Sequence, residues 1–230
     1  MNNSLVAAGI SLQNQRKTNM DALLLANRII AGEELLLVCV CDGVGSLEHG
    51  GIASSYAVNL LNEWFESLTE VGHIGLRLRD TVAALNRVII DYARQNSIET
   101  ASTLSALLIK NNSYYIVNIG DSRIYSVNSN TIEQLTVDDA AKSGALTAAI
   151  GFTKEPVFFY SEGTVDEKLF IVCSDGFYKR FDFMQDEIII NRSSLKSERD
   201  MEKALQKSMN KVIALGEGDN ISAALARIAT

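Results

Sequence analysis

Five aspartates stand at the ends of apolar, strand-like stretches, each with glycine, serine or asparagine close by. They are Asp21, Asp42, Asp121, Asp175 and Asp219. A carboxylate at the end of a buried strand is costly unless it is paired, hydrogen-bonded or bound to a cation. Oxygen donors of this kind suit Mg²⁺ or Mn²⁺, whereas two histidines and three cysteines offer little for a zinc or copper site. The aspartates therefore indicate a site for divalent cations.

Taken singly, each aspartate has a plainer explanation, because Asp-Gly is a common turn dipeptide. The order of the motifs favours a shared site instead. Arg-x4-Asp near the start is followed by DGxG, GDSR and SDG, and DN-I-S precedes the last strand-like stretch. We therefore treat the five aspartates as one constellation.

Strand-like stretches, most of them bounded by Gly, Asn or Asp, must position these carboxylates. The predicted strands are Ser4–Ser11, Ala22–Arg28, Leu35–Cys41, Thr103–Lys110, Ser113–Ile119, Arg123–Asn128, Leu169–Cys173 and Ile221–Ile228. The pairs Asn111-Asn112 and Gly120-Asp121 predict hairpin turns within a meander.

Three segments carry the periodicity of amphipathic helices. Apolar residues share one face from Ile52 to Phe65 and again from Leu78 to Tyr92, and a third helix is predicted over Glu198–Leu215. Strands grouped on either side of a helix pair, without regular strand–helix alternation, indicate an α+β fold with antiparallel sheets packed between helical layers.

Composition excludes several classes of function. A formal charge of −7 argues against a nucleic-acid-binding surface. The sequence has no apolar run near the roughly 20 residues needed to cross a bilayer and no signal-peptide pattern at its start, so we expect no membrane insertion and a cytoplasmic location. Cys39, Cys41 and Cys173 lie inside apolar runs and predict small buried hydrophobic residues, not disulfides or zinc ligands.

The ordered motifs resemble those of the metal-dependent, type 2C family of serine/threonine protein phosphatases, especially its compact bacterial members. The matches are Arg16, Asn19 and Asp21 to the first family motif, Asp42–Ser46 to DGMGG or DGHGG, Ser102–Leu104 to the threonine-containing strand motif, Gly120–Arg123 to GDSR, Leu135–Asp139 to LTxDH, Cys173–Gly176 to CSDG, and Gly216–Ser222 to the closing motif. The resemblance covers essentially the whole chain. It implies a single catalytic domain over 1–230, folded as a four-layer α-β-β-α sandwich of two antiparallel β-sheets flanked by helix pairs.

The resemblance also implies a role for each matched residue. Asp42 would bridge two Mn²⁺ or Mg²⁺ ions, the Gly43 carbonyl would ligate one, and Asp175 and Asp219 would complete the other. A hydroxide shared by the ions would then attack the phosphorus of phosphoserine or phosphothreonine. Arg16 would hold the phosphate oxygens.

Further roles follow for residues around these ligands. Asp21 would orient the metal-bound water. Asn220 and Ser222 would orient Asp219 by hydrogen bonding to it without contacting the metal. Asp121 has two open interpretations, as a ligand of a third, weaker cation or as the cap of the GDSR turn. Arg123 is expected to be structural, paired with a buried acid.

Three features depart from the family pattern. Val44 stands where animal relatives carry a histidine regarded as the general acid, so that protonation of the leaving group would fall to water. Met20 replaces an acidic or amide residue before Asp21, which predicts reduced activity or a need for high manganese. The flap is shortened around residues 137–150, which would open the cleft and leave substrate choice to other surfaces or to a partner.

Three functions compete on this sequence. The first is an active phosphatase whose partner is a phosphorylated protein, such as a serine/threonine kinase or its target. The second is a catalytically weak or silent phosphatase-like adaptor in a signalling pathway, suggested by Met20, Val44 and the short flap. The third, a nucleotide-binding protein that uses DGVGSLEHGG as a phosphate loop, has weak support because neither GxxxxGK[ST] nor GxGxxG is present.

Overall fold

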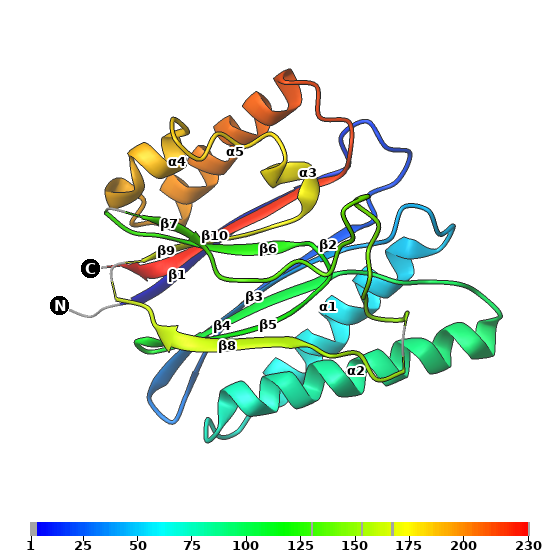
Figure 1. The fold of residues 1–230 in the computed structure, drawn as a ribbon. Coiled ribbons are helices and arrows are strands. Elements are labelled where there is room, and N and C mark those ends of the chain that lie inside the picture. The colour runs from blue at the N-terminus through cyan, green and yellow to red at the C-terminus, as the bar shows by residue number, and fades with distance from the viewer. Residues whose placement is uncertain (1–3, 130, 153, 167, 230) are drawn as a thin grey trace.

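Two antiparallel sheets face each other and form the inner layers of the protein, as the computed structural model shows for residues 4–129, 131–152, 154–166 and 168–229 (Figure 1). The first sheet has the strand order β1 (Ser4–Leu12), β10 (Ile221–Ala229), β9 (Leu169–Cys173), β6 (Arg123–Val127) and β7 (Ile132–Gln134). The second has the order β2 (Asp21–Ile30), β3 (Glu33–Asp42), β4 (Leu104–Lys110), β5 (Ser113–Ile119) and β8 (Phe159–Thr164).

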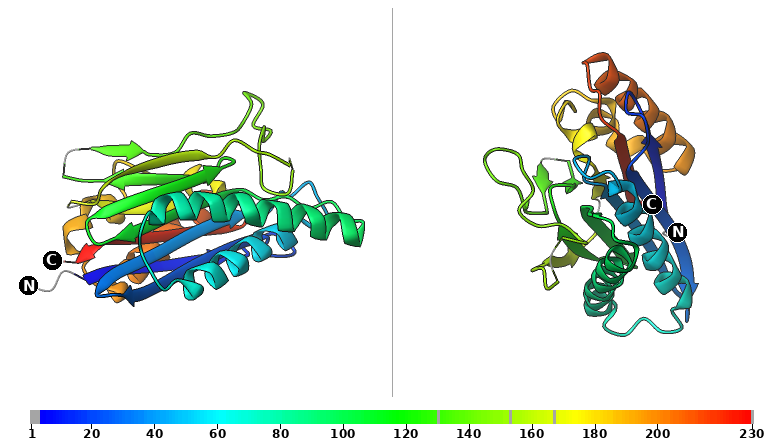
Figure 2. Two further views of the ribbon diagram at one scale, coloured as in Figure 1. Left: turned by 90° about the horizontal axis from the view of Figure 1, so that it is seen from below. Right: turned by 90° about the vertical axis from the view of Figure 1, so that its right-hand side faces the viewer.

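Helices cover the outer face of each sheet. The helices α1 (Gly50–Ser67) and α2 (Ile74–Asn96) pack on the second sheet, and Figure 2 shows them side by side. The first sheet is covered by α5 (Glu198–Ala214), together with the short helices α3 (Asp175–Tyr178), α4 (Glu187–Ile190) and η1 (Arg192–Ser194). The predicted four-layer sandwich is confirmed, although one long helix with short ones replaces the expected second helix pair. No helix in the described ranges is long and apolar enough to span a membrane.

The strand β3 shows why the sheets stack in this way. Its run LLLVCVC is buried on both faces, because alternate side chains point to opposite sides of a strand. Leu35, Leu37, Cys39 and Cys41 pack toward α1 and α2, whereas Leu36, Val38 and Val40 pack against the other sheet. As predicted, Cys39, Cys41 and Cys173 are buried free thiols.

The eight predicted strands are all present, with bounds that differ by at most two residues. Two strands were missed. The strand β7 has three residues, and β8 has the polar sequence FYSEGT and forms the edge of its sheet. Neither segment carries the apolar alternation on which strand prediction depends.

The prediction of a hairpin at Gly120-Asp121 was wrong. The strand β5 pairs with β4 and β8 in one sheet, whereas β6 pairs with β7 and β9 in the other. Gly120 has a φ of +93°, which lets the chain leave the second sheet and cross to the first. The Asn111-Asn112 hairpin, by contrast, is confirmed between β4 and β5.

A buried carboxylate ties the short helix α4 to α5. Asp186 is 2% exposed and accepts hydrogen bonds from Ile188 N at 3.0 Å and from Ser208 Oγ at 2.5 Å, and it lies 3.6 Å from Lys211 Nζ. The same carboxylate therefore caps one helix and pairs with two side chains of the other.

We expect Asp186→Ala to lower the free energy of unfolding by about 3 kcal/mol, because it uncaps α4 and leaves the buried Ser208 hydroxyl without its acceptor. Urea unfolding at neutral pH measures the change. Glu202→Ala, an exposed change on α5, should stay within about 0.5 kcal/mol. Equal losses in the two variants would contradict this assignment.

Candidate metal centre

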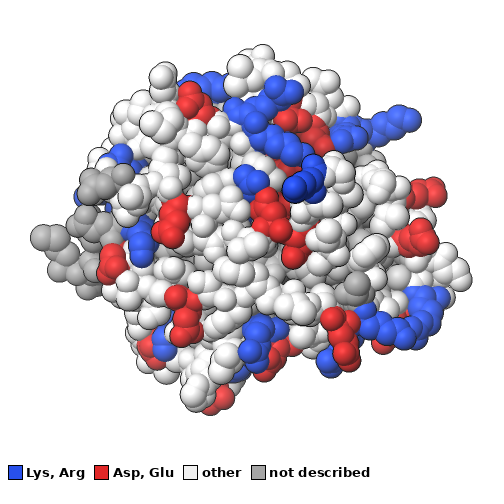
Figure 3. All heavy atoms as spheres, in the orientation of Figure 1, with Lys and Arg blue, Asp and Glu red and all other residues white. Residues whose placement is uncertain are grey.

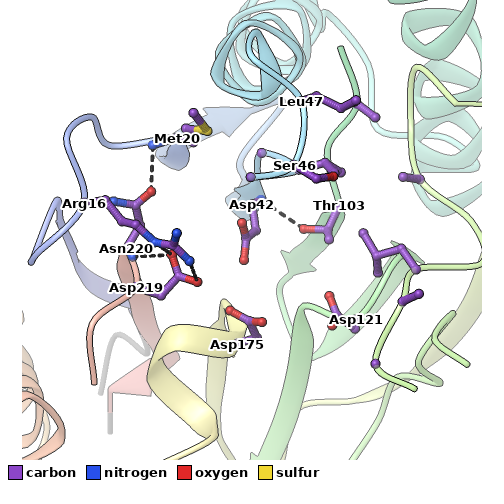
Figure 4. Close-up of a pocket in the computed structure, with 18 of the residues that line it drawn as sticks. Arg16, Met20, Asp42, Ser46, Leu47, Thr103, Asp121, Asp175, Asp219 and Asn220 are labelled. Carbon is purple, nitrogen blue, oxygen red and sulfur yellow. Dashed lines mark hydrogen bonds and ion pairs between the residues drawn. The ribbon is translucent and has the colours of Figure 1, made fainter. Parts of the chain in front are cut away.

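A cleft of about 960 Å³ opens at the end of the sandwich where β3 and β5 finish and β10 starts. Four of the five predicted aspartates line it: Asp42, Asp121, Asp175 and Asp219. The carboxylates of Asp42, Asp121 and Asp175 point into the space between them (Figure 4). Asp21 lies beside Asp42, as its partner across the β2–β3 pair. Segments far apart in the sequence thus bring all five carboxylates to one place.

Asp21 and Asp42 are ionisable groups in a poorly solvated position. Asp21 is 8% exposed and accepts a hydrogen bond from Ser174 Oγ at 2.9 Å through Oδ2. Within the described part of the chain, its Oδ1 is a buried oxygen with no hydrogen-bond partner. Burial raises the pKa of Asp21 to about 6, and hydroxyl groups nearby only partly oppose the shift. Burial, followed by the charges of Asp21 and Asp175, raises the pKa of Asp42 well above its ordinary value.

Hydroxyl groups fix the end of β3 on which Asp42 stands. The Asp42 N–H donates to Thr103 Oγ1 at 2.9 Å, and Ser102 Oγ donates to the Asp42 carbonyl at 3.0 Å. Thr103 Oγ1 lies 2.6 Å from Ser122 Oγ, within the GDSR segment. The serine–threonine motif before β4 therefore joins two of the aspartate-bearing loops.

Two glycines allow the site loops to touch backbone to backbone. A Cβ on Gly43 would lie 2.7 Å from the carbonyl carbon of Gly50 and 2.8 Å from the carbonyl oxygen of Met20. A Cβ on Gly176 would lie 2.0 Å from the carbonyl oxygen of Asn220. Since no side chain fits at either distance, the glycine of each Asp-Gly pair is needed for packing.

Two basic side chains neutralise carboxylates of the cleft. Arg16 forms a bidentate pair with Asp219, with Nε 2.7 Å from Oδ1 and Nη2 2.6 Å from Oδ2. Lys179 Nζ lies 2.5 Å from Asp175 Oδ2. Burial acts to raise the pKa of Asp219, but the hydrogen bonds and charge of Arg16 outweigh it and hold the pKa below its ordinary value.

The donor chemistry of the cleft fits Mg²⁺ or Mn²⁺. Asp21 has an unpaired buried oxygen, the pKa of Asp42 is raised, and Asp175 and Asp219 have cationic partners, so that the cluster favours the binding of positive charge. Among the described residues, no three acidic, histidine or cysteine side chains converge as a finished metal site. The carboxylates of Asp175 and Asp219 form ion pairs with Lys179 and Arg16.

The GDSR segment is held by the two aspartates of Leu135–Asp139. Gly120 N donates to Asp139 Oδ2 at 3.0 Å, and Asp139 N donates to the Gly120 carbonyl at 2.9 Å. Arg123 pairs with Asp138, with Nη2 2.6 Å from Oδ2, in agreement with its expected structural role. Because Asp139 caps the turn, the Asp121 carboxylate remains directed into the cleft.

Comparison with known proteins agrees with this geometry. The model of the family described as "Protein phosphatase 2C" matches residues 9–226. The chain belongs to this family. It is 29% identical over 216 residues to "Serine/threonine phosphatase stp" of Listeria welshimeri, a match that covers 82% of this chain and 83% of the relative. The predicted family and protein phosphatase activity are thereby confirmed.

Solved structures show the same fold. The serine/threonine phosphatase Stp1 from Staphylococcus aureus superposes with a TM-score of 0.85 at 23% identity, covering 99% of this chain and 96% of that one. The catalytic domain of the phosphatase PstP, solved in complex with two manganese ions, gives a TM-score of 0.77 at 22% identity over 98% of this chain and 99% of that one.

In this phosphatase Asn220 contacts Asp219 through its backbone, whereas its side chain hydrogen-bonds to other segments. Its amide donates to the carbonyls of Gln13 and Thr18 at 2.8 and 3.0 Å and accepts from Met20 N at 2.9 Å. The side chain thus holds the β1–β2 connection, while its backbone N–H donates to Asp219 Oδ1 at 2.8 Å. An amide with both donor and acceptor atoms can satisfy three backbone groups at once, which the sequence motif does not reveal.

Ser222 also has a different place from the one expected. Its hydroxyl donates to Ser11 Oγ at 2.8 Å, and its backbone N–H donates to Ser174 Oγ at 3.0 Å. These contacts join β10 to β1 and to the residue that hydrogen-bonds Asp21. Ser222 therefore supports Asp21 and not Asp219.

The loop at residues 137–150 contains no helix, and each of its residues is described. It forms a tight turn in which Ala141 N donates to the Ala145 carbonyl at 2.8 Å. Leu146 in this loop and Phe152, which lies two residues beyond it and is 65% exposed, give the cleft an apolar wall. Shortening relative to other phosphatases remains a prediction, and an open cleft is consistent with it.

Sequence reasoning overlooked Lys179 and Ser174. Ser174 lies inside the CSDG motif and donates to Asp21, a contact between segments that no local pattern predicts. Lys179 stands four residues after Asp175, which on a helix places the two side chains on one face. The four-residue spacing between Asp175 and Lys179 can be read from the sequence. It indicates a contact only if the segment is helical, and the short helix α3 was not predicted.

We expect Mn²⁺ to raise the unfolding temperature of chelator-treated protein, because a cation that binds only the folded state stabilises it by about 2.7 kcal/mol at 100 times its dissociation constant. Asp42→Asn should remove this shift and raise the unfolding temperature in chelator, because it relieves repulsion among buried carboxylates. Scanning fluorimetry measures both values. Asp91→Asn on α2 serves as the control, and a Mn²⁺ shift that survives Asp42→Asn would contradict the assignment.

Proposed function

We propose that Asp42, Gly43, Asp175 and Asp219 hold two divalent cations, with which this phosphatase hydrolyses phosphoserine and phosphothreonine in proteins. The observation that supports the proposal is that Asp42, Asp175 and Asp219 line one open cleft together with Arg16 (Figure 4). When bound, such ions would lower the pKa of water at the site, so that hydroxide would be available near neutral pH. Manganese or magnesium fits the oxygen donors, and PstP provides a precedent for manganese.

The protein contributes orientation and charge. The unpaired Oδ1 of Asp21 is available to accept a hydrogen bond from the attacking water and so to orient it. Asp21 is itself held by Ser174, whose backbone and hydroxyl are tied to Ser222. Val44 lines the cleft and has no proton to donate, so the leaving alkoxide takes its proton from solvent.

Arg16 binds the phosphate in this proposal. Its planar guanidinium now forms two parallel hydrogen bonds to the Asp219 carboxylate, and a phosphate group offers the same pair of acceptors. The side chain of Arg16 is 55% exposed, which leaves it free to turn from Asp219 to the substrate. Cation binding at Asp219 would therefore release the residue that binds phosphate.

The substrates follow from the shape of the cleft. A metal centre that opens directly to solvent admits a phosphorylated side chain on a folded protein or a flexible segment. We infer that the partner is a serine/threonine kinase or its target, acting with this phosphatase in the cytoplasm.

The two rival functions have less support. A silent adaptor would be expected to lose a cation ligand, yet Asp42, Asp175 and Asp219 all line the cleft. A phosphate loop would need free N–H groups at the start of α1, but the Ala53 N–H donates to Thr100 Oγ1 at 3.0 Å, and Thr100 in turn donates to the His49 carbonyl.

Asp175→Asn should lower Mn²⁺-dependent hydrolysis of a phosphothreonine peptide by at least about 100-fold, because it removes a charged cation ligand. p-Nitrophenyl phosphate should show the same loss, since the change affects chemistry common to both substrates. Asp91→Asn, far from the cleft on α2, is the matched control. Hydrolysis of the phosphothreonine peptide that persists in chelator, or that survives Asp175→Asn, would contradict the proposal.

Arg16→Ala should raise KM for the phosphopeptide about 10- to 100-fold, which corresponds to the loss of charge-assisted hydrogen bonds worth roughly 1.5–3 kcal/mol. Mn²⁺ affinity should stay the same or increase, because Asp219 loses its competing partner. Steady-state kinetics and calorimetry separate the two effects. Weaker Mn²⁺ binding with an unchanged KM would assign Arg16 a structural role instead.

A further inference from the structure

Lys179 is a cation that the fold places at the metal centre. The residue follows α3, and its backbone N–H donates to the Asp175 carbonyl at 3.1 Å, which completes one helical turn. This turn brings Nζ to 2.5 Å from Asp175 Oδ2. The Asp175 side chain is 18% exposed, so that the ammonium contacts a carboxylate with little access to water.

An exposed lysine four residues from an aspartate commonly contributes only about 0.3–0.5 kcal/mol, and the Lys179 side chain is 56% exposed. Its surroundings set it apart from such a pair. Burial and then the charge of Asp175 raise the pKa of Asp121 to about 6, whereas Lys179 acts to lower it. Lys179 also acts to lower the pKa of Asp219. One ammonium therefore acts on three carboxylates of the cleft.

Neighbouring cations pair with acidic residues other than Asp175. Arg180, the next residue, pairs with Glu217 at 3.3 Å, and Arg16 pairs with Asp219. In Figure 3, basic side chains gather beside acidic ones over the region of α3 and the end of α5 in Figure 1. Among the ion pairs of the described residues, the one from Lys179 is the pair that reaches Asp175.

The charges of the cleft indicate what the Lys179–Asp175 ion pair contributes. The site contains five carboxylates, those of Asp21, Asp42, Asp121, Asp175 and Asp219, and two divalent ions would supply four positive charges. Since cation binding at Asp219 would release Arg16 to the substrate, the ammonium of Lys179 supplies the fifth. With that charge in place, a third divalent ion would bind at a site already neutralised, and it would meet a fixed positive charge within a few ångströms.

We propose that Lys179 is a built-in cation of the metal centre and takes, beside Asp175 and Asp121, the place of a third divalent ion. The proposal rests on the proposed function, since it assumes two ions on the remaining carboxylates. Lys179 is a positioning residue that acts through Asp175, and it explains how Asp121 faces the cleft without needing a metal of its own.

The test counts bound Mn²⁺ in the absence of substrate, by electron paramagnetic resonance of the free ion and by calorimetry. Wild type and Lys179→Arg should bind two ions. Lys179→Met should bind a third at least tenfold more tightly than wild type does, and Asp121→Asn in the Lys179→Met background should abolish that gain. Lys17→Met, which removes an ammonium from another rim of the cleft, should bind two ions.

The role of Lys179 would be overturned if the wild type bound three Mn²⁺ ions. It would also be overturned if Lys179→Met bound the same number of Mn²⁺ ions as the wild type with the same affinity. Lys179→Gln repeats the test with a polar side chain, so that the outcome does not depend on how methionine packs. Phosphopeptide hydrolysis shows whether a negative result concerns only the role of Lys179 or the proposed function as well. Two bound ions and normal hydrolysis in wild type, with no gain in Lys179→Met, would contradict this inference alone, whereas no Mn²⁺ binding and no hydrolysis would contradict the proposed function and with it this inference.

Discussion

Mutual repulsion among carboxylates at the ends of buried strands is the constraint on which the active cleft depends. Asp21 and Asp42 face each other across β2 and β3, and Asp121, Asp175 and Asp219 enter from other segments. Burial and neighbouring negative charge raise the pKa of Asp42 well above its ordinary value, which expresses the cost of gathering these groups. Positive charge must offset this cost, and in the structure Arg16 and Lys179 supply part of it.

The rest of the fold can be understood as a frame that keeps the carboxylates together despite their repulsion. Stacked sheets bury strand β3 on both faces and so fix the position of Asp42. Glycine at positions 43 and 176 lets neighbouring loops meet without side chains between them. The Asn220 amide ties the β1–β2 connection, which bears Arg16, to the start of β10. These backbone contacts explain why the motifs contain small and polar residues as well as the acids.

Sequence reasoning succeeded where one segment carries its own signal. The apolar run of β3, the periodicity of α1 and α2 and the ordered aspartates each predicted what the structure shows. It failed where the outcome depends on which segments meet. Gly120-Asp121 has the composition of a hairpin turn, yet β8 pairs with the edge of β5 that a hairpin would have used. Asn220 and Ser222 were expected to orient Asp219, their neighbour in the sequence, but their side chains hydrogen-bond to segments about 200 residues away.

Anomalous diffraction at the manganese edge, from crystals grown with Mn²⁺, tests most directly whether these carboxylates hold two cations. We expect two peaks, one on each side of Asp42, with Asp175 and Asp219 among the ligands, Arg16 released from Asp219 and Lys179 still beside Asp175. Manganese bound elsewhere, or an intact Arg16–Asp219 pair with no peak near Asp42, would contradict this expectation.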